Sequence, residues 1–413
     1  MNDESIRDAY IYLLGRMLVI RQEMTDRAGD GFAYNTVRYN PLGSADFVNP
    51  NFDVAYLEAW IAVDDDTAVL LEVPEITGRY YTAQVLDEWG EVIVNINERA
   101  TPVKPSGTFA FTKPGSTVSI PPGASRIDLH SGKAKLLGRI ELGDDPDIAV
   151  ALQKRFTLTP LGDITVPAPP PVPGFDNTAL LGVEIFDLAR TVVPSALDVS
   201  PAAAGMQLQA GAVADHVAGS AANRAEVDRL LTEIVIPEFR DYAYTKSARV
   251  VNNWIVGDTG GHYGADYTKR TVANLIGLWA NSPSEVIYFS GSLDADGKPL
   301  DGAGSYVLNF PADALPASAV DGYWSVILVS VPDFRVVPNH LNRYNFNSHS
   351  DLAVETDGSL RIGLGANVPA GVAESNWLPC QPGERFSLTF RAYVPKDIVR
   401  TGQWAPPPIV RSP

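Results

Sequence analysis

The sequence predicts a mainly β protein with a helical insert, an α+β chain in which two jelly-roll-like antiparallel β-sandwiches are joined by a helical region. Three observations predict this fold class. Short apolar runs alternate with Gly, Pro and Asp punctuation near both ends of the chain. The stretch between these two regions is rich in Ala and Leu. The 413 residues include 34 Gly and 32 Pro, which suits many short strands joined by turns.

The elements follow in order. Residues 3–27 carry apolar side chains at helical spacing, so we expect an N-terminal helix within 1–32. Residues 33–165 are expected to form the first β-sandwich domain, with a short helical patch near 146–156. Its clearest strands are Ala68-Val-Leu-Leu-Glu-Val, Tyr80-Tyr-Thr-Ala-Gln-Val-Leu, Glu91-Val-Ile-Val-Asn-Ile and Lys135-Leu-Leu-Gly-Arg-Ile.

A proline-rich segment separates the first sandwich from the rest. Residues 166–177 contain Val166-Pro-Ala-Pro-Pro-Pro-Val-Pro-Gly174, which predicts a stiff, extended linker. Residues 178–283 are expected to be a helical insert, and 284–413 the second β-sandwich domain.

The two β regions echo each other. Leu70-Leu-Glu-Val-Pro74 parallels Val307-Leu-Asn-Phe-Pro311, and Arg79-Tyr-Tyr-Thr parallels Gly322-Tyr-Trp-Ser. Each region ends on a strand with a central arginine, Arg139 or Arg391. A duplication predicts two sandwiches of like topology. The alternative is coincidence, because apolar strands followed by Pro and paired aromatics are common in β proteins.

Composition limits the partners and the compartment. The net charge of −17 argues against nucleic acid and anionic membranes, since both require a basic surface. Cys380 is the single cysteine, so no disulfide forms within the chain. The N-terminus shows no signal peptide, and no window reaches the roughly 18 apolar residues that cross a bilayer. We therefore expect a soluble, cytoplasmic protein, or an exported one if a leader was removed.

Several motifs resemble those of a bacterial family built from two paired domains of unknown function, numbered 1254 (N-terminal) and 1214 (C-terminal). They are Asn49-Pro-Asn-Phe-Asp-Val-Ala-Tyr56, Arg79-Tyr-Tyr81, Leu137-Gly-Arg139, Asp321-Gly-Tyr-Trp-Ser-Val, Pro338-Asn-His-Leu-Asn-Arg-Tyr344, Asp357-Gly-Ser-Leu, Asn376-Trp-Leu-Pro379 and Trp404-Ala-Pro-Pro407. The resemblance covers nearly the whole chain. It implies a pair of jelly-roll sandwiches joined by helices, and it implies no reaction.

The segment Gly261–Arg270 is the strongest catalytic candidate. We expect it to be helical, which would place His262, Asp266 and Arg270 on one face. A carboxylate between an imidazole and a guanidinium fixes the imidazole tautomer and raises its pKa, as acid–base catalysis requires. His262, Asp266, Tyr267 and Arg270 are therefore the catalytic candidates, with Tyr263 as a substrate contact. The alternative is a structural helix with a weak ion pair.

Two further segments supply substrate-binding candidates. Asp53 and Tyr56 follow Asn49-Pro-Asn, and they would either line a cleft or belong to a capped turn. A loop concentrates amides, a cation and a ring that suit a carboxylate or a hydroxyl-rich ligand, namely Asn339, Asn342, Arg343 and Tyr344. Alternatively, Arg343 pins this loop to its own domain through backbone bonds.

Arg79 is the last substrate-binding candidate. Together with Arg139 and Arg391 it lies within an apolar strand pattern, where a lone charge is costly. Each of the three is therefore expected to have a carboxylate or carbonyl partner.

Other signals point away from cofactors. The five histidines show no paired metal-ligand spacing, and no phosphate-binding glycine loop follows a strand. We therefore expect no metal and no cofactor. Cys380 has no local activating base, which favours an inert thiol.

These features predict a cofactor-free enzyme that uses acid–base chemistry on a small polar or aromatic metabolite. Its reaction would be hydrolysis, elimination or isomerisation, which makes it a hydrolase, lyase or isomerase. The pocket is expected between the helical insert and one sandwich. The alternative is a non-catalytic module that binds carbohydrate or another small molecule, or that assembles as a homo-oligomer.

Overall fold

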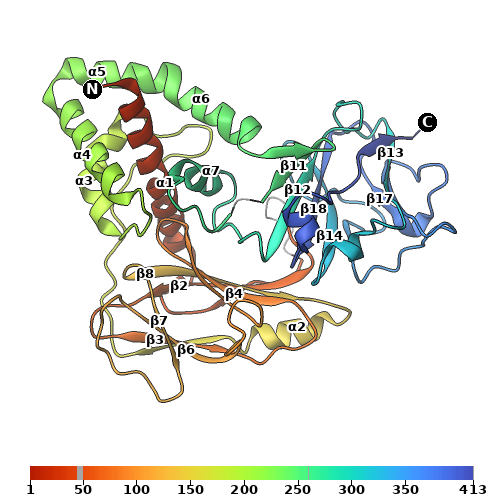
Figure 1. The fold of residues 1–413 in the computed structure, drawn as a ribbon, viewed down its shortest axis with the longest axis horizontal. Coiled ribbons are helices and arrows are strands. Elements are labelled where there is room, and N and C mark those ends of the chain that lie inside the picture. Colours follow the sequence, from red (N-terminus) through yellow and green to blue (C-terminus); the bar gives the residue numbers. More distant parts are fainter. Residues whose placement is uncertain (44–49, 259, 413) are drawn as a thin grey trace.

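A computed structural model describes residues 1–43, 50–258 and 260–412. Two β-sandwiches and a helical unit make up the described chain (Figure 1). Helix α1 (Asp3–Ala28) begins at Asn2, whose side chain accepts a hydrogen bond from the Ser5 amide at 2.8 Å. Acidic Asp3 and Glu4 in its first turn complement the helix dipole. None of the described helices is long and apolar enough to cross a membrane.

The first sandwich packs a five-stranded sheet of order β1-β2-β8-β4-β5 on a four-stranded sheet of order β7-β6-β3-β9. Its strands are β1 (Arg38–Tyr39), β2 (Val54–Ala62), β3 (Ala68–Val73), β4 (Tyr81–Leu86), β5 (Val92–Ile96), β6 (Gly107–Thr112), β7 (Ser125–Asp128), β8 (Lys133–Glu141) and β9 (Thr157–Leu161). Helix α2 (Pro146–Gln153) packs beside β2 and β8.

The second sandwich packs a six-stranded sheet of order β10-β11-β12-β18-β14-β15 on a four-stranded sheet of order β17-β16-β13-β19. Its strands are β10 (Arg249–Val251), β11 (Trp254–Gly257), β12 (Val286–Gly291), β13 (Ser305–Phe310), β14 (Trp324–Ser330), β15 (Asn345–Asn347), β16 (Leu360–Gly365), β17 (Trp377–Pro379), β18 (Phe386–Tyr393) and β19 (Ile409–Arg411). Short helical turns accompany it, namely η5 (Pro316–Ala319), η6 (Glu374–Asn376) and α8 (Asp397–Arg400).

The two sandwiches have the like topology that a duplication predicts. The order β2-β8-β4-β5 of the first is matched by β12-β18-β14-β15 of the second, and β7-β6-β3-β9 is matched by β17-β16-β13-β19. Each half contains one parallel pair among antiparallel neighbours, β6 with β7 and β16 with β17. Register agrees as well, because Tyr56 pairs with Arg139 as Tyr288 pairs with Arg391.

The helical unit packs around α1, which contributes the largest share of its core. Its members are η1 (Val183–Leu188), α3 (Ala189–Val192), η2 (Val193–Ser195), α4 (Ala203–Gly219), α5 (Ala221–Leu230), η3 (Leu231–Val235), α6 (Ile236–Asp241), η4 (Tyr242–Lys246) and α7 (Tyr267–Ile276). The proline-rich segment 166–174 is neither helix nor strand.

Two details differ from the sequence-based expectation. The hairpin of β10 and β11 lies within the stretch expected to be mostly helical, and it joins the sheet of β12. Its turn places Asn252 and Asn253 at φ of 52° and 63°, a geometry that asparagine tolerates and that suits a tight hairpin.

The expected helix over 261–270 is wrong in its start. Helix α7 begins at Tyr267, and the Asp266 side chain caps it by accepting from the Lys269 amide at 3.0 Å. Gly261 and Gly264 precede the cap with positive φ of 79° and 58°, which no α-helix contains. His262 and Asp266 therefore do not share a helical face with Arg270.

Candidate active site

The hairpin turn between β4 and β5 carries the first part of the candidate site. The Asp87 side chain organises this turn, because its Oδ1 accepts from the amides of Trp89 at 2.8 Å and Glu91 at 2.9 Å. Gly90 supplies the positive φ of 91° that the turn requires. The turn inserts between α1, α7 and residues 195–200, so residues of the first sandwich meet the helical unit here.

Arg270 of α7 forms the charged centre of this contact. Its Nη1 and Nη2 donate to the two carboxylate oxygens of Asp198 at 2.9 and 2.8 Å, and Tyr12 donates to the same carboxylate at 2.8 Å. The guanidinium lies over the Trp89 ring, 4.8 Å from its centroid. Burial opposes ionisation of Asp198, but hydrogen bonds and charge from Arg270 hold its pKa below the ordinary value.

Glu91 lies beside Arg270 with one oxygen uncommitted. Its Oε2 accepts from the Tyr263 amide at 3.2 Å, while Oε1 is 3.8 Å from Arg270 Nη1 and makes no hydrogen bond within the described structure. Burial raises the pKa of Glu91 to about 7, and the Tyr263 amide and Arg270 offset only part of that effect. Near neutral pH this carboxyl can therefore both give and take a proton.

His130 supplies a second titratable group on the same side. Its Nδ1 lies 2.7 Å from Oδ2 of Asp87. Because a carboxylate accepts hydrogen bonds, the neutral imidazole carries its proton on Nδ1 and its lone pair on Nε2. The hydrogen bond to Asp87 raises the pKa of His130; burial opposes this rise, and the charges of Glu91 and Asp198 add to it. The His130 side chain is 25% exposed, so solvent reaches it. We call the set Tyr12, Asp87, Glu91, His130, Asp198 and Arg270 the Arg270 cluster.

A second ion pair anchors the turn to α1. Arg16 donates to the backbone oxygen of Glu88 at 2.9 Å and to its Oε1 at 3.1 Å. Both side chains are buried, and burial raises the pKa of Glu88 to about 7 although Arg16 lowers it.

The structure divides the sequence-predicted residues among three places. Of the catalytic candidates and Tyr263, only Tyr263 and Arg270 contact Glu91. His262 is exposed in the loop before α7, and Asp266 caps the helix and lies 3.5 Å from Lys269. Tyr267 is half-buried and packs edge-on against Tyr12, 6.1 Å between ring centroids.

Sequence reasoning missed most of the Arg270 cluster. Asp87, Glu91 and His130 come from the first sandwich, whereas Asp198 comes from an irregular segment of the helical unit. The run Asp87-Glu-Trp-Gly-Glu91 carried a usable signal, since Asp and Gly in this order mark a hairpin turn. No local pattern indicates that His130 or Asp198 lies beside that turn.

A second polar cluster fills the contact between the sandwiches, and we call it the sandwich interface. Asp53 precedes β2, and its Oδ1 accepts from the side-chain amides of Asn345 at 2.7 Å and Asn347 at 2.9 Å. Asn51 Oδ1 also accepts from the Asp53 amide at 2.9 Å, as the capped-turn alternative expected. Asn49 lies outside the described residues.

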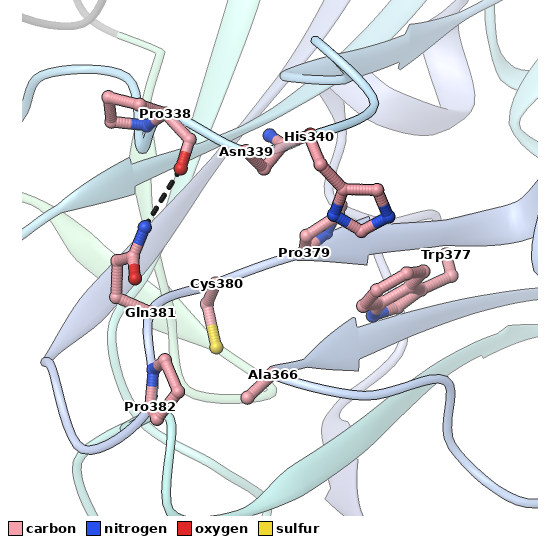
Figure 2. A pocket seen from close by; sticks show the side chains of 9 residues that line it. All are labelled: Pro338, Asn339, His340, Ala366, Trp377, Pro379, Cys380, Gln381 and Pro382. Carbon is pink, nitrogen blue, oxygen red and sulfur yellow. Dashed lines mark hydrogen bonds between the residues drawn. The ribbon is translucent and has the colours of Figure 1, made fainter.

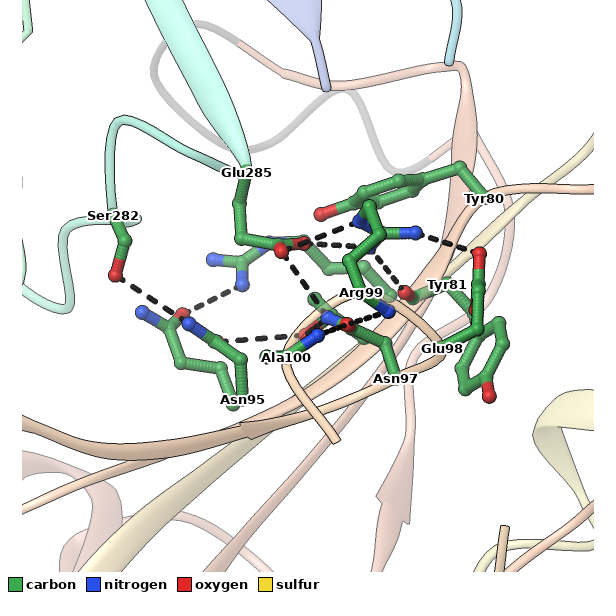
Figure 3. Close-up of polar contacts among 12 residues, drawn as sticks. Tyr80, Tyr81, Asn95, Asn97, Glu98, Arg99, Ala100, Ser282 and Glu285 are labelled. Carbon is green, nitrogen blue, oxygen red and sulfur yellow. Dashed lines mark hydrogen bonds and ion pairs between the residues drawn. The ribbon is translucent and has the colours of Figure 1, made fainter. Parts of the chain in front are cut away.

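The interface is reciprocal. Glu285 precedes β12 as Asp53 precedes β2, and it accepts from Asn97 Nδ2 at 3.2 Å and Arg99 Nη2 at 2.7 Å (Figure 3). The first sandwich thus presents an acid to two asparagines of the second, and the second presents an acid to one asparagine and one arginine of the first.

Buried tyrosines complete the sandwich interface. Tyr323 stacks on Tyr393 with ring centroids 4.2 Å apart, and Tyr80 packs edge-on against Tyr393 at 5.1 Å. The Tyr393 hydroxyl accepts from Asn51 Nδ2 at 2.6 Å. Tyr56 lies at the edge of this group and remains partly exposed.

The three strand arginines have the expected partners. Arg139 Nη1 donates to Oε1 of Gln84 at 2.8 Å, and Arg391 Nη2 donates to the Pro50 carbonyl at 3.1 Å. Arg79 is half-buried and donates to the carbonyls of Glu141 and Leu142 at 2.9 and 3.0 Å. The Arg79 side chain therefore anchors the backbone at the end of β8.

The loop before β15 is held by its own domain. Asn339 Oδ1 accepts from the amides of Leu341 and Arg343, both at 3.1 Å. Arg343 Nη1 donates to the carbonyls of Glu374 and Trp377 at 2.6 and 3.0 Å, as the pinned-loop alternative expected. Two candidates of this loop remain, Asn342 and Tyr344. Asn342 has a backbone φ of 50°. The Tyr344 ring stacks on the Phe52 ring, with 5.7 Å between the centroids.

A pocket of about 450 Å³ opens beside this loop (Figure 2). Its lining consists of Pro338, Asn339, His340, Ala366, Trp377, Pro379, Cys380, Gln381 and Pro382. Burial raises the pKa of the Cys380 thiol to about 12, so the sulfur stays protonated and a poor nucleophile. Among the residues that the structure describes, no group of three or more His, Cys, Asp or Glu could hold a metal ion.

Comparison with known proteins places the chain in a family. Residues 32–160 match the domain of unknown function DUF1254, and residues 285–397 match the domain of unknown function DUF1214. The chain therefore belongs to the family in which these two domains of unknown function are paired, as its motifs predicted.

A solved structure shows the same fold. The VPA0106 protein from Vibrio parahaemolyticus is 19% identical, with a TM-score of 0.72 and 100% of both chains covered. An uncharacterised protein from Burkholderia cenocepacia is 13% identical at a TM-score of 0.45, covering 99% of this chain and 93% of that one. No curated protein matches the sequence.

Proposed function

We propose that this protein is an enzyme that moves protons on a small polar metabolite at the Arg270 cluster. The observation that carries the proposal is Glu91, a buried carboxyl with a pKa of about 7 and an unbonded Oε1, near the Asp87–His130 pair. Groups that titrate near working pH are the most effective general acids and bases. Two such groups with different neighbours are typical of acid–base sites.

We assign different roles to the two groups. Asp87 binds the Nδ1 proton of His130, so Nε2 is the atom that accepts a proton from substrate. Glu91 in its protonated form is the donor, because Oε1 has no other hydrogen-bond partner among the described residues. Arg270 is a positioning residue whose contacts with Asp198 and Trp89 hold the walls around Glu91.

This pair of roles suits hydrolysis, elimination or isomerisation. Each of the three reactions needs one proton removed and one delivered, and none of them needs an added electron acceptor. His130 is the more exposed member of the pair, so we expect a substrate to reach it first.

The test is the consumption of compounds from a mixed metabolite extract, followed by mass spectrometry. The wild-type protein should deplete one compound, and Glu91→Gln and His130→Asn should each slow that depletion about a hundredfold. The exposed His262→Asn is the matched control and should act like wild type. The proposal fails if Glu91→Gln and His130→Asn keep the wild-type rate, or if no compound is consumed.

The pocket of Figure 2 favours a second candidate function, non-catalytic binding of a small molecule. His340 and Trp377 lie 6.2 Å apart between ring centroids and offer flat faces to a ring or sugar. Loss of ligand-induced thermal stabilisation in His340→Ala, with Glu91→Gln unaffected, would support binding here. The reverse pattern would support the Arg270 cluster. Assembly as a homo-oligomer stays a prediction that solution mass can test.

A further inference from the structure

Arg139 is a buried cation for which the described residues supply no acidic partner. It is 6% exposed, on the face of β8 that meets the second sandwich. Within the described structure it forms no ion pair, and its one hydrogen bond goes to the neutral amide oxygen of Gln84. No described residue accepts a hydrogen bond from its Nε. A guanidinium removed from water without a counter-charge is costly, so an anion in this place would stabilise the protein.

Comparison of the two like sandwiches shows why the acid is missing. Arg391 occupies the equivalent position in the second sandwich, and the charge of Asp53 acts on it. The acid equivalent to Asp53 is Glu285, but Arg99 takes its carboxylate at 2.7 Å (Figure 3). Glu141, a third acid at this contact, pairs with His349 of the second sandwich. None of these three acids pairs with Arg139 among the described residues.

Tyrosines surround Arg139 and provide hydroxyl donors. Tyr56, Tyr80, Tyr288 and Tyr393 all lie close enough to interact with its charge. The guanidinium carbon is 5.5 Å from the centroid of the Tyr56 ring. The hydroxyl of Tyr80 is buried and has no hydrogen-bond partner among the described residues. Tyr56 and Tyr288 keep part of their surface exposed.

We propose that the sandwich interface binds the carboxylate group of a small organic anion, held by the Nε edge of Arg139 and by the hydroxyl of Tyr80. The side edge of a guanidinium matches the two oxygens of a carboxylate, which favours this group over a spherical ion. The ring faces of Tyr56 and Tyr288 favour an anion with a flat apolar body. This site is separate from the Arg270 cluster and does not depend on its chemistry.

Isothermal calorimetry and thermal shift with sodium benzoate, sodium acetate and sodium chloride, at constant ionic strength, test the proposal. Benzoate should raise the melting temperature of the wild-type protein in a dose-dependent way, acetate should do so more weakly, and chloride should not. Arg139→Met and Tyr80→Phe should each weaken benzoate binding about tenfold or more.

The neighbour of Tyr80 provides a matched control. Tyr81 begins β4 directly after Tyr80 but lies in the core of the first sandwich, where it donates to the Pro105 carbonyl at 3.0 Å. Tyr81→Phe should bind benzoate like wild type. Arg139→Met should also melt higher than wild type without benzoate, because it removes an uncompensated charge. The proposal is overturned if benzoate does not stabilise the wild-type protein, or if Arg139→Met and Tyr80→Phe bind it as wild type does.

Discussion

Glu91 shows how burial sets chemistry at the scale of one residue. Its pKa of about 7 reflects a folded state that favours the neutral carboxyl. The neutral Glu91 carboxyl therefore contributes to the free energy of unfolding. This contribution is fully present below the ordinary pKa of 4.5 and is lost as pH rises through 7. Ionised Glu91 therefore costs the folded protein about 3 kcal/mol above pH 7.

Glu91→Gln should remove this cost. The variant should melt higher than wild type at pH 8, and the difference should shrink at pH 5, where wild-type Glu91 is mostly neutral. Calorimetry at both pH values measures the effect. Glu75→Gln changes an exposed acid and should show no such dependence on pH. Equal differences at pH 5 and pH 8 for Glu91→Gln would contradict the assignment.

The pKa of His130 should depend on its partner Asp87. The hydrogen bond to Asp87 raises the pKa of His130, so Asp87→Asn should lower it toward or below 6.5. The proton shift of the imidazole ring, followed by NMR across pH, measures this value. Asp266→Asn leaves the pair untouched and should change nothing. An unchanged His130 pKa in Asp87→Asn would show that the pair does not form.

Residue types alone predicted part of the site. Arg270 and Tyr263 were found because their segment concentrates titratable and aromatic groups. His262 was predicted because its spacing from Asp266 and Arg270 would place all three on one helical face. In the structure the imidazole beside Glu91 is His130 instead, and it meets Asp87 across 43 positions of chain. Contacts of this range leave no local pattern in a single sequence.

At the scale of elements, the β4–β5 turn and helix α7 fix each other. Asn274 of α7 donates to the carbonyls of Trp89 and Gly15 at 3.0 and 3.1 Å, joining the turn to α1. A Cβ added at Gly90 would overlap with the Asn274 side chain, and the backbone there has a φ of 91°. Position 90 of the turn thus has no room for a side chain.

Gly90→Ala should therefore destabilise the protein by about 3 kcal/mol, from backbone strain together with displacement of Asn274. Gly115→Ala is the matched control, with a φ of 76° but open space around its Cβ. It should cost about 1 kcal/mol. Chemical unfolding monitored by tryptophan fluorescence compares the two. Equal losses would show that the contact with Asn274 carries no energy.

Elements were predicted best where side-chain alternation is strong and worst near glycines. The strands of both sandwiches follow from apolar runs between turn residues, as does the long opening helix. The start of α7 was placed too early because Gly261 and Gly264 were read as helical. The β10–β11 hairpin was missed although Asn252-Asn253 is a turn signal.

At the scale of the whole molecule, two sandwiches of like topology hold each other by reciprocal contacts between acids and side-chain amides. Asp53 and Asn345 are 292 positions apart, and Asn97 and Glu285 are 188 apart. The echo of strand motifs predicted the two like sandwiches, but not which faces meet. Docking depends on residues such as Asp53 and Glu285, which local patterns assign only to turns.

A double-mutant cycle on Arg99 and Glu285 should measure one such contact. Glu285 is buried, so Arg99→Met and Glu285→Gln should show a coupling energy of about 1–3 kcal/mol. Arg99→Met combined with Asp53→Asn should be additive within about 0.5 kcal/mol, since these side chains make no contact. Additivity in the first pair would mean that the ion pair does not stabilise the interface.

The central claim is that Glu91 and His130 both exchange protons within the Arg270 cluster, Glu91 with a pKa of about 7 and His130 with a pKa above its ordinary value. Carbon-13 NMR of labelled protein, following the Glu91 carboxyl and the His130 ring from pH 4 to pH 9, tests it most directly. We predict that Glu91 titrates near 7 and that His130 titrates above 6.5. A Glu91 midpoint near 4.5 would contradict the account.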